Sequence, residues 1–235
     1  MGTYVKGRQV NIRFVEGAKE MKNMMQKRWM FVGALMAFGL FLTFPGKVQA
    51  AKKPLVISFV HRDNITGAKE MDVDALSSAT VYSGPTGEKK STIEVIRDTL
   101  VEGKKAKKYA IRVKDTYSPN YNTTVSRADD EIDKNTPLKL KKPKVNLDPY
   151  KTIYLCTPIW HVSLPQPVKV FLEANDFTGK TIYVFGTHLG SGFGQNVALV
   201  RNLCPGAKVK QGKTYLGDAS NASVKKSVKK WLKKH

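Results

Sequence analysis

Short segments rich in apolar and β-branched residues recur along the chain and predict the strands of a sheet. They cover residues 54–60, 108–113, 152–158, 181–186 and 207–213. The first reads PLVISFV, and the third, which is the clearest, reads TIYLCTP. Continuous apolar runs of this length are typical of strands that are buried on both faces. A sheet covered on both sides is therefore expected.

Segments with apolar residues at helical spacing follow each of these strands and predict five helices. They cover residues 91–102, 123–135, 165–174, 194–203 and 220–235. In the first of them, Ile93, Ile96 and Leu100 share one face, which is the pattern of a helix packed on a core. Gly103 is expected at the C′ position, where a left-handed backbone ends many helices.

The last predicted helix is amphipathic. Its apolar residues have the spacing i, i+4, i+7 and i+8, and they are Val224, Val228, Trp231 and Leu232. Lysines occupy its outer faces. Such a helix is found either on a membrane surface or as a cover on a sheet. The narrow apolar stripe favours the second arrangement.

The alternation of strand and helix predicts an α/β fold with a doubly wound, five-stranded parallel sheet. Helices lie on both faces in such folds, and the crossovers are right-handed. With five strands the expected order is 2-1-3-4-5. Ligands then bind at the carboxyl ends of strands 1, 3 and 4. The three loops that leave these strands are the places to look for function.

The N-terminal residues 1–50 are predicted to lie outside this domain, which spans 51–235. An uncharged apolar run at 29–44 follows Lys27 and Arg28 and is broken by Pro45-Gly46. A basic flank, a short apolar core and small residues before Ala51 form a secretory signal peptide. We expect cleavage after Ala50 and export to the cell exterior, the cell wall or the periplasm. A membrane anchor through 29–44 is the alternative, although the run is short for a span.

The formal net charge of +21 favours anionic surroundings. The lysines gather at 104–108, 139–144 and 225–234, without regular interleaving by aromatic residues and without a nucleic-acid-binding motif. Anionic envelope polymers or a lipid surface are therefore the expected partners, and nucleic acid is not.

Cysteine and histidine usage does not indicate a metal site. The two cysteines are Cys156, inside the third strand, and Cys204. A buried free thiol is common in a strand, and a disulfide between the two is the alternative. His61, His161, His188 and His235 are scattered without metal-ligand spacing. The sequence contains no acid–base pair and no nucleophile with its base that would indicate another catalytic site.

Two loops at the expected ligand edge have unusual composition. The fourth strand is predicted to end at Gly186, and glycines recur at 190, 192 and 194. Such density lets the backbone take positive φ and approach a flat ligand closely. The loop after the third strand places Trp160 at the same edge, where an aromatic ring either stacks on a planar ligand or closes a hydrophobic cluster.

Residues 150–206 resemble the flavodoxin-like proteins of bacteria. The motifs that carry the resemblance are Thr157-Pro158-Ile159-Trp160, Pro165-Gln166-Pro167, Phe177-x-Gly179-Lys180, Thr187-His188-Leu189-Gly190-Ser191-Gly192-Phe193-Gly194 and Leu203-Cys204-Pro205-Gly206. In that family the two loops sandwich the isoalloxazine ring of FMN. The resemblance implies the same fold over residues 54–235 and FMN as the cofactor.

The resemblance also implies which residues bind the cofactor. One side of the ring would contact Trp160 with Ile159 and His161, and backbone N–H groups of 187–192 would face the pyrimidine edge. Either His161 or His188 would influence the charge of the flavin or relay protons, or would be only a polar loop residue. The cofactor-binding residues are Thr86, Gly87, Ser91, Thr92, Thr157, Pro158, Ile159, Trp160, His161, Thr187, His188, Leu189, Gly190, Ser191, Gly192 and Phe193.

The loop that would hold the FMN phosphate departs from the family pattern. The family has Ser-x-Thr-Gly-Asn-Thr directly after the first strand, whereas here about thirty residues precede the helix that begins at Ser91. Ser91 and Thr92 then stand at the Asn-Thr positions, beside Lys89 and Lys90. Hydroxyls at a helix N-terminus bind phosphate in many proteins, but serving as an N-cap is the commonest role of such a serine.

Two functions are consistent with these observations. The first is an exported FMN-binding protein that takes part in electron transfer or flavin-dependent reduction, either as a carrier or as a small oxidoreductase. The second is a flavodoxin-like fold that has lost FMN and acts as a basic envelope-binding module. The redox partner is not indicated by the sequence.

Overall fold

A computed structural model describes residues 53–65, 90–133 and 138–235. These residues belong to one compact unit, Ala50–His235. The predicted signal peptide or anchor lies outside the described residues, and so do Thr86 and Gly87. In the described part of the chain, none of the helices combines the length and apolar character of a membrane span.

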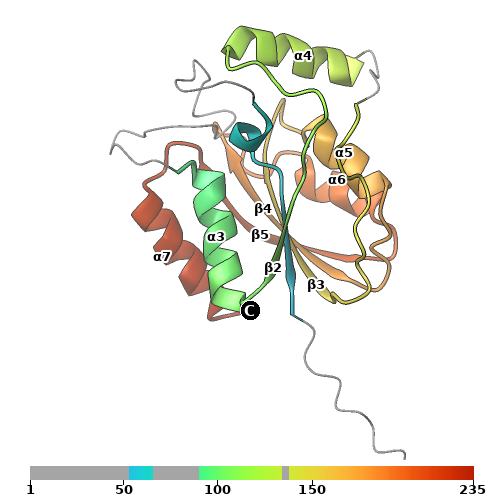
Figure 1. The fold of residues 1–235 in the computed structure, drawn as a ribbon. Helices are drawn as coiled ribbons and strands as arrows, with labels where there is room; N and C mark the ends of the chain where they lie inside the picture. Colours follow the sequence, from blue (N-terminus) through green and yellow to red (C-terminus); the bar gives the residue numbers. More distant parts are fainter. Residues whose placement is uncertain (1–52, 66–89, 134–137) are drawn as a thin grey trace, which may run out of the picture. The chain divides into compact units, whose positions relative to one another are not determined.

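The sheet has the predicted five parallel strands in the predicted order, β2-β1-β3-β4-β5 (Figure 1). The strands are β1 (Leu55–Ser58), β2 (Lys107–Ala110), β3 (Thr152–Pro158), β4 (Thr181–His188) and β5 (Lys208–Leu216). In the register, Ser58 of β1 pairs with Cys156 of β3, and Pro158 pairs with Thr187 of β4. The carboxyl ends of these three strands therefore meet at one edge.

Strand β4 is longer than the sequence predicted. The predicted end at Gly186 is wrong, because pairing with β5 resumes after an irregularity between Val184 and Gly186 and continues to His188. Gly186 lies inside the strand, where a Cβ would meet the side chain of Ile159 and the carbonyl of Thr157, each at 3.2 Å. The glycine thus allows the β3 loop to approach the strand and does not end it.

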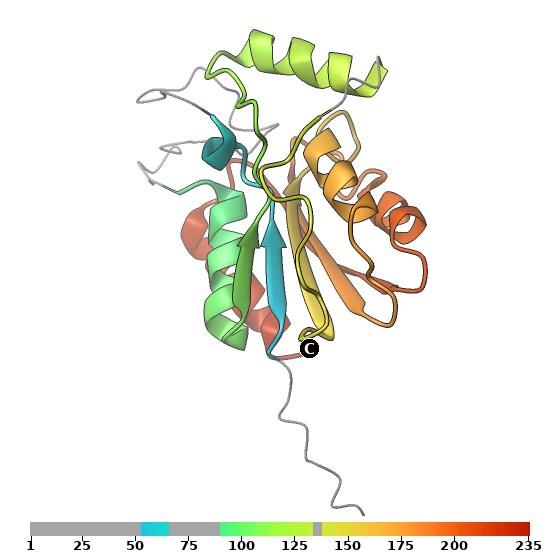
Figure 2. The same ribbon diagram turned by 45° about the vertical axis from the view of Figure 1, so that its right-hand side comes forward.

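The helices cover both faces of the sheet. They are α3 (Thr92–Lys104), α4 (Tyr121–Asp133), α5 (Gln166–Glu173), α6 (Asn196–Leu203) and α7 (Asn221–Leu232), and a short 3-10 turn, η1, covers His61–Asn64. Helices α3 and α7 lie on one side, and α5 and α6 on the other (Figures 1 and 2). Alternate strand residues divide between the two cores, with Ile153 on the α5–α6 side and Tyr154 on the α3–α7 side.

Helix α3 does not end at Gly103, and that prediction is wrong. The helix continues to Lys104, and Lys105 takes the left-handed cap with φ 48°. A Cβ on Gly103 would lie 2.5 Å from the end of the Leu232 side chain. The glycine therefore allows α3 and α7 to pack closely. In the sequence, its position near the helix end suggested a cap instead.

The predicted cover formed by the C-terminal helix is confirmed. Trp231 of α7 is buried, and its ring lies 5.0 Å from that of Phe185 and 5.1 Å from that of Tyr183, both on β4. Both cysteines are free and buried, as the placement of Cys156 in a strand predicted, and burial raises the pKa of each thiol. The alternative of a disulfide is wrong for this structure.

Helix α4 has an unexpected position. Instead of covering a face of the sheet, it lies beyond the carboxyl ends of the strands in both views (Figures 1 and 2). The face next to β2 is partly covered by the connector that follows, whose Leu140 and Leu147 join the core on the α5–α6 side. The connector pairs with the extension of β2, since Lys141 donates its backbone N–H to Arg112 O at 2.8 Å.

Candidate functional site

The structure brings together the two loops that the sequence singled out. Ile159 donates its backbone N–H to Thr187 O at 2.8 Å, and Gln195 donates to Val162 O at 2.8 Å. Gly194 makes the second contact possible, because a Cβ there would lie 2.4 Å from the Val162 carbonyl oxygen. The loops after β3 and β4 therefore form a single surface at the carboxyl edge of the sheet.

The loop after β3 is a strained two-residue turn. Trp160 and Ser163 exchange backbone hydrogen bonds of 3.0 and 2.7 Å, and the two residues between them have positive φ, 48° for His161 and 60° for Val162. Asn and Gly favour such turns, whereas a β-branched residue with positive φ is an outlier. Strain of this kind is found at functional sites, and Val162 in this turn is 52% exposed.

The glycine-rich loop presents backbone N–H groups. Gly190 has φ 139° and Gly192 has φ 59°. Gly190 donates to His188 Nδ1 at 2.8 Å, so this nitrogen carries no proton, and partial burial lowers the pKa of His188. The amides of Ser191 and Gly192 have no acceptor among the described residues. These two donors are available to a ligand.

Apolar side chains are exposed at the same edge. Of the four large hydrophobic residues that are exposed in the described part of the chain, three follow or end β3, β4 and β5: Val162, Leu189 and Leu216, at 52%, 55% and 47%. Exposed apolar residues beside available backbone donors suit a flat ligand with one apolar and one polar edge. Val162 lies in the loop after β3 that the sequence singled out, but it was not named among the cofactor-binding residues, and nothing in the sequence context of Leu216 distinguishes it.

Trp160 takes the second of the two roles that the sequence left open. Only 8% of the residue is exposed, and its ring meets those of Phe59, His61 and Tyr117 edge to face at 5.6, 5.2 and 5.5 Å. Ile159 is buried as well. The tryptophan closes an aromatic cluster below the loop surface, and stacking of its face on a cofactor stays a prediction.

Helix α4 is attached to this cluster and to the β3 loop. Tyr117 donates its hydroxyl to Glu131 at 2.8 Å, the Arg127 guanidinium lies 4.0 Å from the centre of the Tyr117 ring, and His161 Nε2 lies 3.3 Å from Asp129. Burial and the Arg127 charge lower the pKa of His61 to about 3. Sequence reasoning missed this cluster because its members lie far apart in the chain.

The N-terminus of α3 reaches the same edge through β5. Thr92 donates its hydroxyl to Gly217 O at 2.6 Å, and Gly217 donates its N–H to His188 O at 3.1 Å. Ser91 is the N-cap of α3, and both its N–H and its hydroxyl donate to Glu94. The two hydroxyls predicted to hold a phosphate thus have partners within the protein, and phosphate binding by them stays a prediction.

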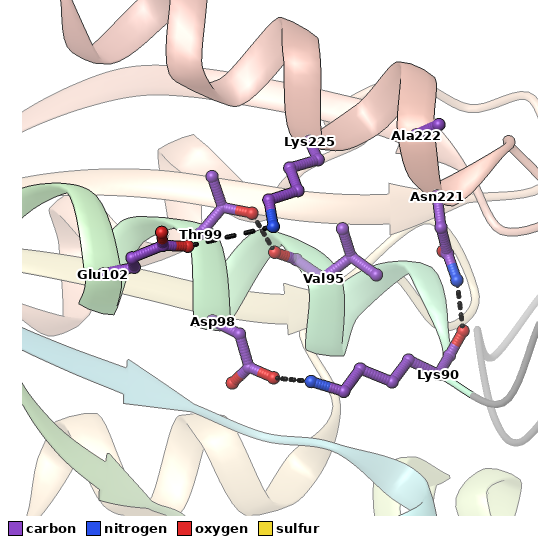
Figure 3. Close-up of a pocket in the computed structure, with 8 residues that line it drawn as sticks. All are labelled: Lys90, Val95, Asp98, Thr99, Glu102, Asn221, Ala222 and Lys225. Carbon is purple, nitrogen blue, oxygen red and sulfur yellow. Dashed lines mark hydrogen bonds and ion pairs between the residues drawn. The ribbon is translucent and has the colours of Figure 1, made fainter.

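A separate groove of about 450 Å³ lies between α3 and α7. Figure 3 shows the side chains that line it. Its charged side chains pair with one another, Lys90 with Asp98 at 2.8 Å and Lys225 with Glu102 at 3.9 Å. The remaining lining residues are Val95, Thr99, Asn221 and Ala222. None of these residues comes from the loops after β3 and β4, so the groove is distinct from the predicted ring site.

Comparison with known proteins identifies the family of this chain. The Flavodoxin family model matches residues 87–235. A solved structure of an inferred flavoprotein from Bacteroides uniformis is 24% identical with a TM-score of 0.54, over 75% of this chain and 97% of the other. Another, from Bacteroides eggerthii, is 19% identical with a TM-score of 0.54, over 77% and 96%. These two similarities show the same fold.

A flavoprotein in complex with FMN from Lactobacillus acidophilus is more distant, 16% identical with a TM-score of 0.47, over 77% of this chain and 99% of the other. No curated protein matches the chain.

Proposed function

The chain belongs to the flavodoxin family, and on this premise we propose that it binds a flavin at the surface formed by the loops after β3 and β4. FMN is the cofactor that the sequence predicts. The observation that supports this proposal is the meeting of exposed Val162 and Leu189 with the available amides of Ser191 and Gly192. The apolar side chains suit the dimethylbenzene part of the ring, and the amides suit its pyrimidine oxygens and nitrogens.

A bound flavin would supply transfer of one or two electrons, and the protein would set how readily the transfer occurs. The Ser191 and Gly192 amides would donate to the pyrimidine edge and thereby favour negative charge on it. His188 would keep the loop in place, since its Nδ1 accepts the Gly190 N–H. We propose a role as an electron carrier or a small flavin-dependent oxidoreductase, and the two differ in whether a partner protein or a small substrate takes the electrons.

Replacing an exposed apolar residue of the loop surface tests the ring site. Val162→Asp places a charge against the proposed ring position, and we expect FMN to bind at least about tenfold more weakly. Ile132→Asp is the matched control, because Ile132 is also an exposed hydrophobic residue but lies on α4. Fluorescence titration of FMN with the full-length variants measures both affinities. Equal FMN affinities in the two variants would contradict binding of the flavin ring at the loop surface.

We also propose that the protein is exported and that residues 29–44 direct this export. The supporting observation is the sequence alone, with its basic flank, apolar run and small residues before Ala51. Expression in a bacterial host with an active secretion system, followed by mass measurement of the exported protein, tests it. A mature chain that begins at Ala51 is expected, whereas an intact N-terminus in the membrane fraction would indicate an anchor.

A contact with anionic envelope polymers or lipids is the second candidate function. The lysines of α7 support it, because Lys225, Lys226, Lys229 and Lys230 are all exposed while the apolar stripe of the helix is buried. Charge pairing of exposed groups is screened by salt. Sedimentation with anionic and with neutral vesicles should show binding to the anionic ones only, and that binding should disappear at high salt. Equal sedimentation with both would contradict the proposal.

A further inference from the structure

The N-terminus of α3 is occupied by an anionic side chain of the protein itself, that of Glu94. The carboxylate of Glu94 accepts the backbone N–H of Ser91 at 3.0 Å and the Ser91 hydroxyl at 2.9 Å, both through Oε2. This reciprocal arrangement is a capping box, in which the third residue of the helix reaches back to the N-cap. Both Ser91 donors, and part of the positive charge of the helix terminus that would attract a phosphate here, thus act on Glu94 instead.

Two guanidinium groups hold the carboxylate in this position. Arg97 Nη2 lies 3.8 Å from Glu94 Oε1, and Arg62 Nη1 lies 3.7 Å from Oε2. Glu94 and Arg97 are both buried, each with 8% of its surface exposed. Arg97 is further fixed by Asp98 at 2.8 Å and by Asp63 at 3.6 Å. The carboxylate is therefore part of a partly buried charge network, and its displacement by a ligand would leave Arg97 without one of its anions.

The second predicted phosphate ligand is engaged as well. Thr92 donates its hydroxyl to Gly217 O at 2.6 Å, so it contributes to the packing of α3 against the segment after β5. A phosphate dianion at this helix terminus would lie beside the Glu94 carboxylate and would meet no free hydroxyl from Ser91 or Thr92. The Ser91 donors and the charges of Arg62 and Arg97 already act on Glu94, so a phosphate would have to compete with this carboxylate for them, which disfavours its binding.

We propose that Glu94 determines which flavin this protein takes: the ring is recognised at the β3 and β4 loops, and the 5′-phosphate is not recognised at α3. The inference rests on the proposed function, since it assumes that a flavin ring binds at those loops. Riboflavin, which has the same ring and ribityl chain without the phosphate, then binds at least as tightly as FMN. Glu94 is thus a specificity-determining residue.

Fluorescence titrations of riboflavin and FMN with the full-length protein test this selectivity. The expected result is a riboflavin Kd equal to or lower than the FMN Kd. In Glu94→Gln the carboxylate charge is gone, but Gln also fits the third position of a capping box, so the helix start is kept. We expect FMN to bind about tenfold more tightly to this variant while riboflavin affinity stays unchanged.

Glu102→Gln is the matched control, because it removes the same charge from the same helix at an exposed site near the other end. It should leave the ratio of the two Kd values as in the natural protein. A natural protein that binds FMN more than about tenfold more tightly than riboflavin would overturn the role of Glu94 and leave the proposed function standing. An identical ratio in both variants would also overturn it. If neither flavin binds, the proposed function fails, and the selectivity fails with it.

Discussion

Gly194 lies at one of the contacts between the two loops of the proposed site. It has φ 49°, and a Cβ there would lie 2.4 Å from the carbonyl oxygen of Val162. That oxygen belongs to the backbone and accepts the Gln195 N–H, so it has little room to move. A side chain at this position would therefore push the loops apart, in addition to the strain of the left-handed backbone.

Gly194→Ala should lower the free energy of unfolding by about 2–4 kcal/mol and should weaken flavin binding. Gly192→Ala is the control, because Gly192 has a similar φ of 59° but nothing within 4 Å of the position that a Cβ would take. That variant should lose only about 1 kcal/mol, the cost of the backbone conformation. Urea unfolding measures both. Equal losses would mean that the contact with Val162 contributes nothing.

His61 should make the stability depend on pH. Burial and the Arg127 charge lower its pKa to about 3 in the folded protein, while the unfolded chain has the ordinary value of about 6.5. Between these values the unfolded state binds a proton that the folded state does not. The folded state therefore loses stability as the pH falls below about 6.5, by about 2 kcal/mol at pH 5.

Urea unfolding at pH 7 and pH 5 measures this loss, and His61→Phe isolates it, because phenylalanine keeps a ring in the aromatic cluster but does not titrate. The variant should lose about 2 kcal/mol less than the natural protein between the two pH values. The carboxylates contribute equally to both proteins. The same loss in both would show that His61 does not remain neutral in the folded state.

At the scale of single elements, α7 is the clearest case of stability from packing. Trp231 is 6% exposed, and its ring contacts those of Tyr183, Phe185 and His235. Trp231→Ala should lower the free energy of unfolding by about 3–5 kcal/mol through the lost contacts and the cavity. Lys230→Ala, at the exposed neighbour, should change it by less than about 0.5 kcal/mol. Thermal unfolding of the two variants checks this, and a small loss for Trp231→Ala would mean that α7 is not firmly docked.

The regular elements could be predicted because each has a recognisable pattern of apolar residues in the sequence. Runs such as TIYLCTP predicted the buried strand at its observed bounds, and the spacing of Val224, Val228 and Trp231 predicted a docked helix. The position of α4 in the fold has no corresponding pattern in the sequence. The sequence predicted a helix there but not what it packs against, and the contacts of Tyr117 and His161 with α4 decide that.

Parts of the candidate site were unpredictable for a related reason. The sequence shows Trp160 beside a glycine-rich loop, but the burial of its ring depends on Phe59, His61 and Tyr117, which come from two other segments. Conversely, Val162 is exposed in a turn whose two central residues have positive φ. Such turns normally contain Asn or Gly, so the sequence His161-Val162 does not predict one. Ser91 illustrates a local rule that held, since its role as N-cap is visible in the Ser-x-x-Glu pattern.

In the described domain as a whole, the candidate chemistry lies at one edge of the sheet, while the exposed lysines of α7 lie on a helix that covers a face. This division allows a flavin at the loops after β3 and β4 and an anionic surface at α7 to be bound independently. The groove between α3 and α7 lies beside the lysines of α7, and the charged side chains that line it pair with one another (Figure 3).

The central claim is that a flavin ring binds at the surface where the β3 and β4 loops meet. Titration of riboflavin and of FMN with the purified full-length protein, followed by flavin fluorescence, tests it most directly. We predict saturable quenching with one flavin per chain and a Kd in the micromolar range or below for at least one of them. Unchanged fluorescence of both flavins at protein concentrations well above micromolar would contradict it.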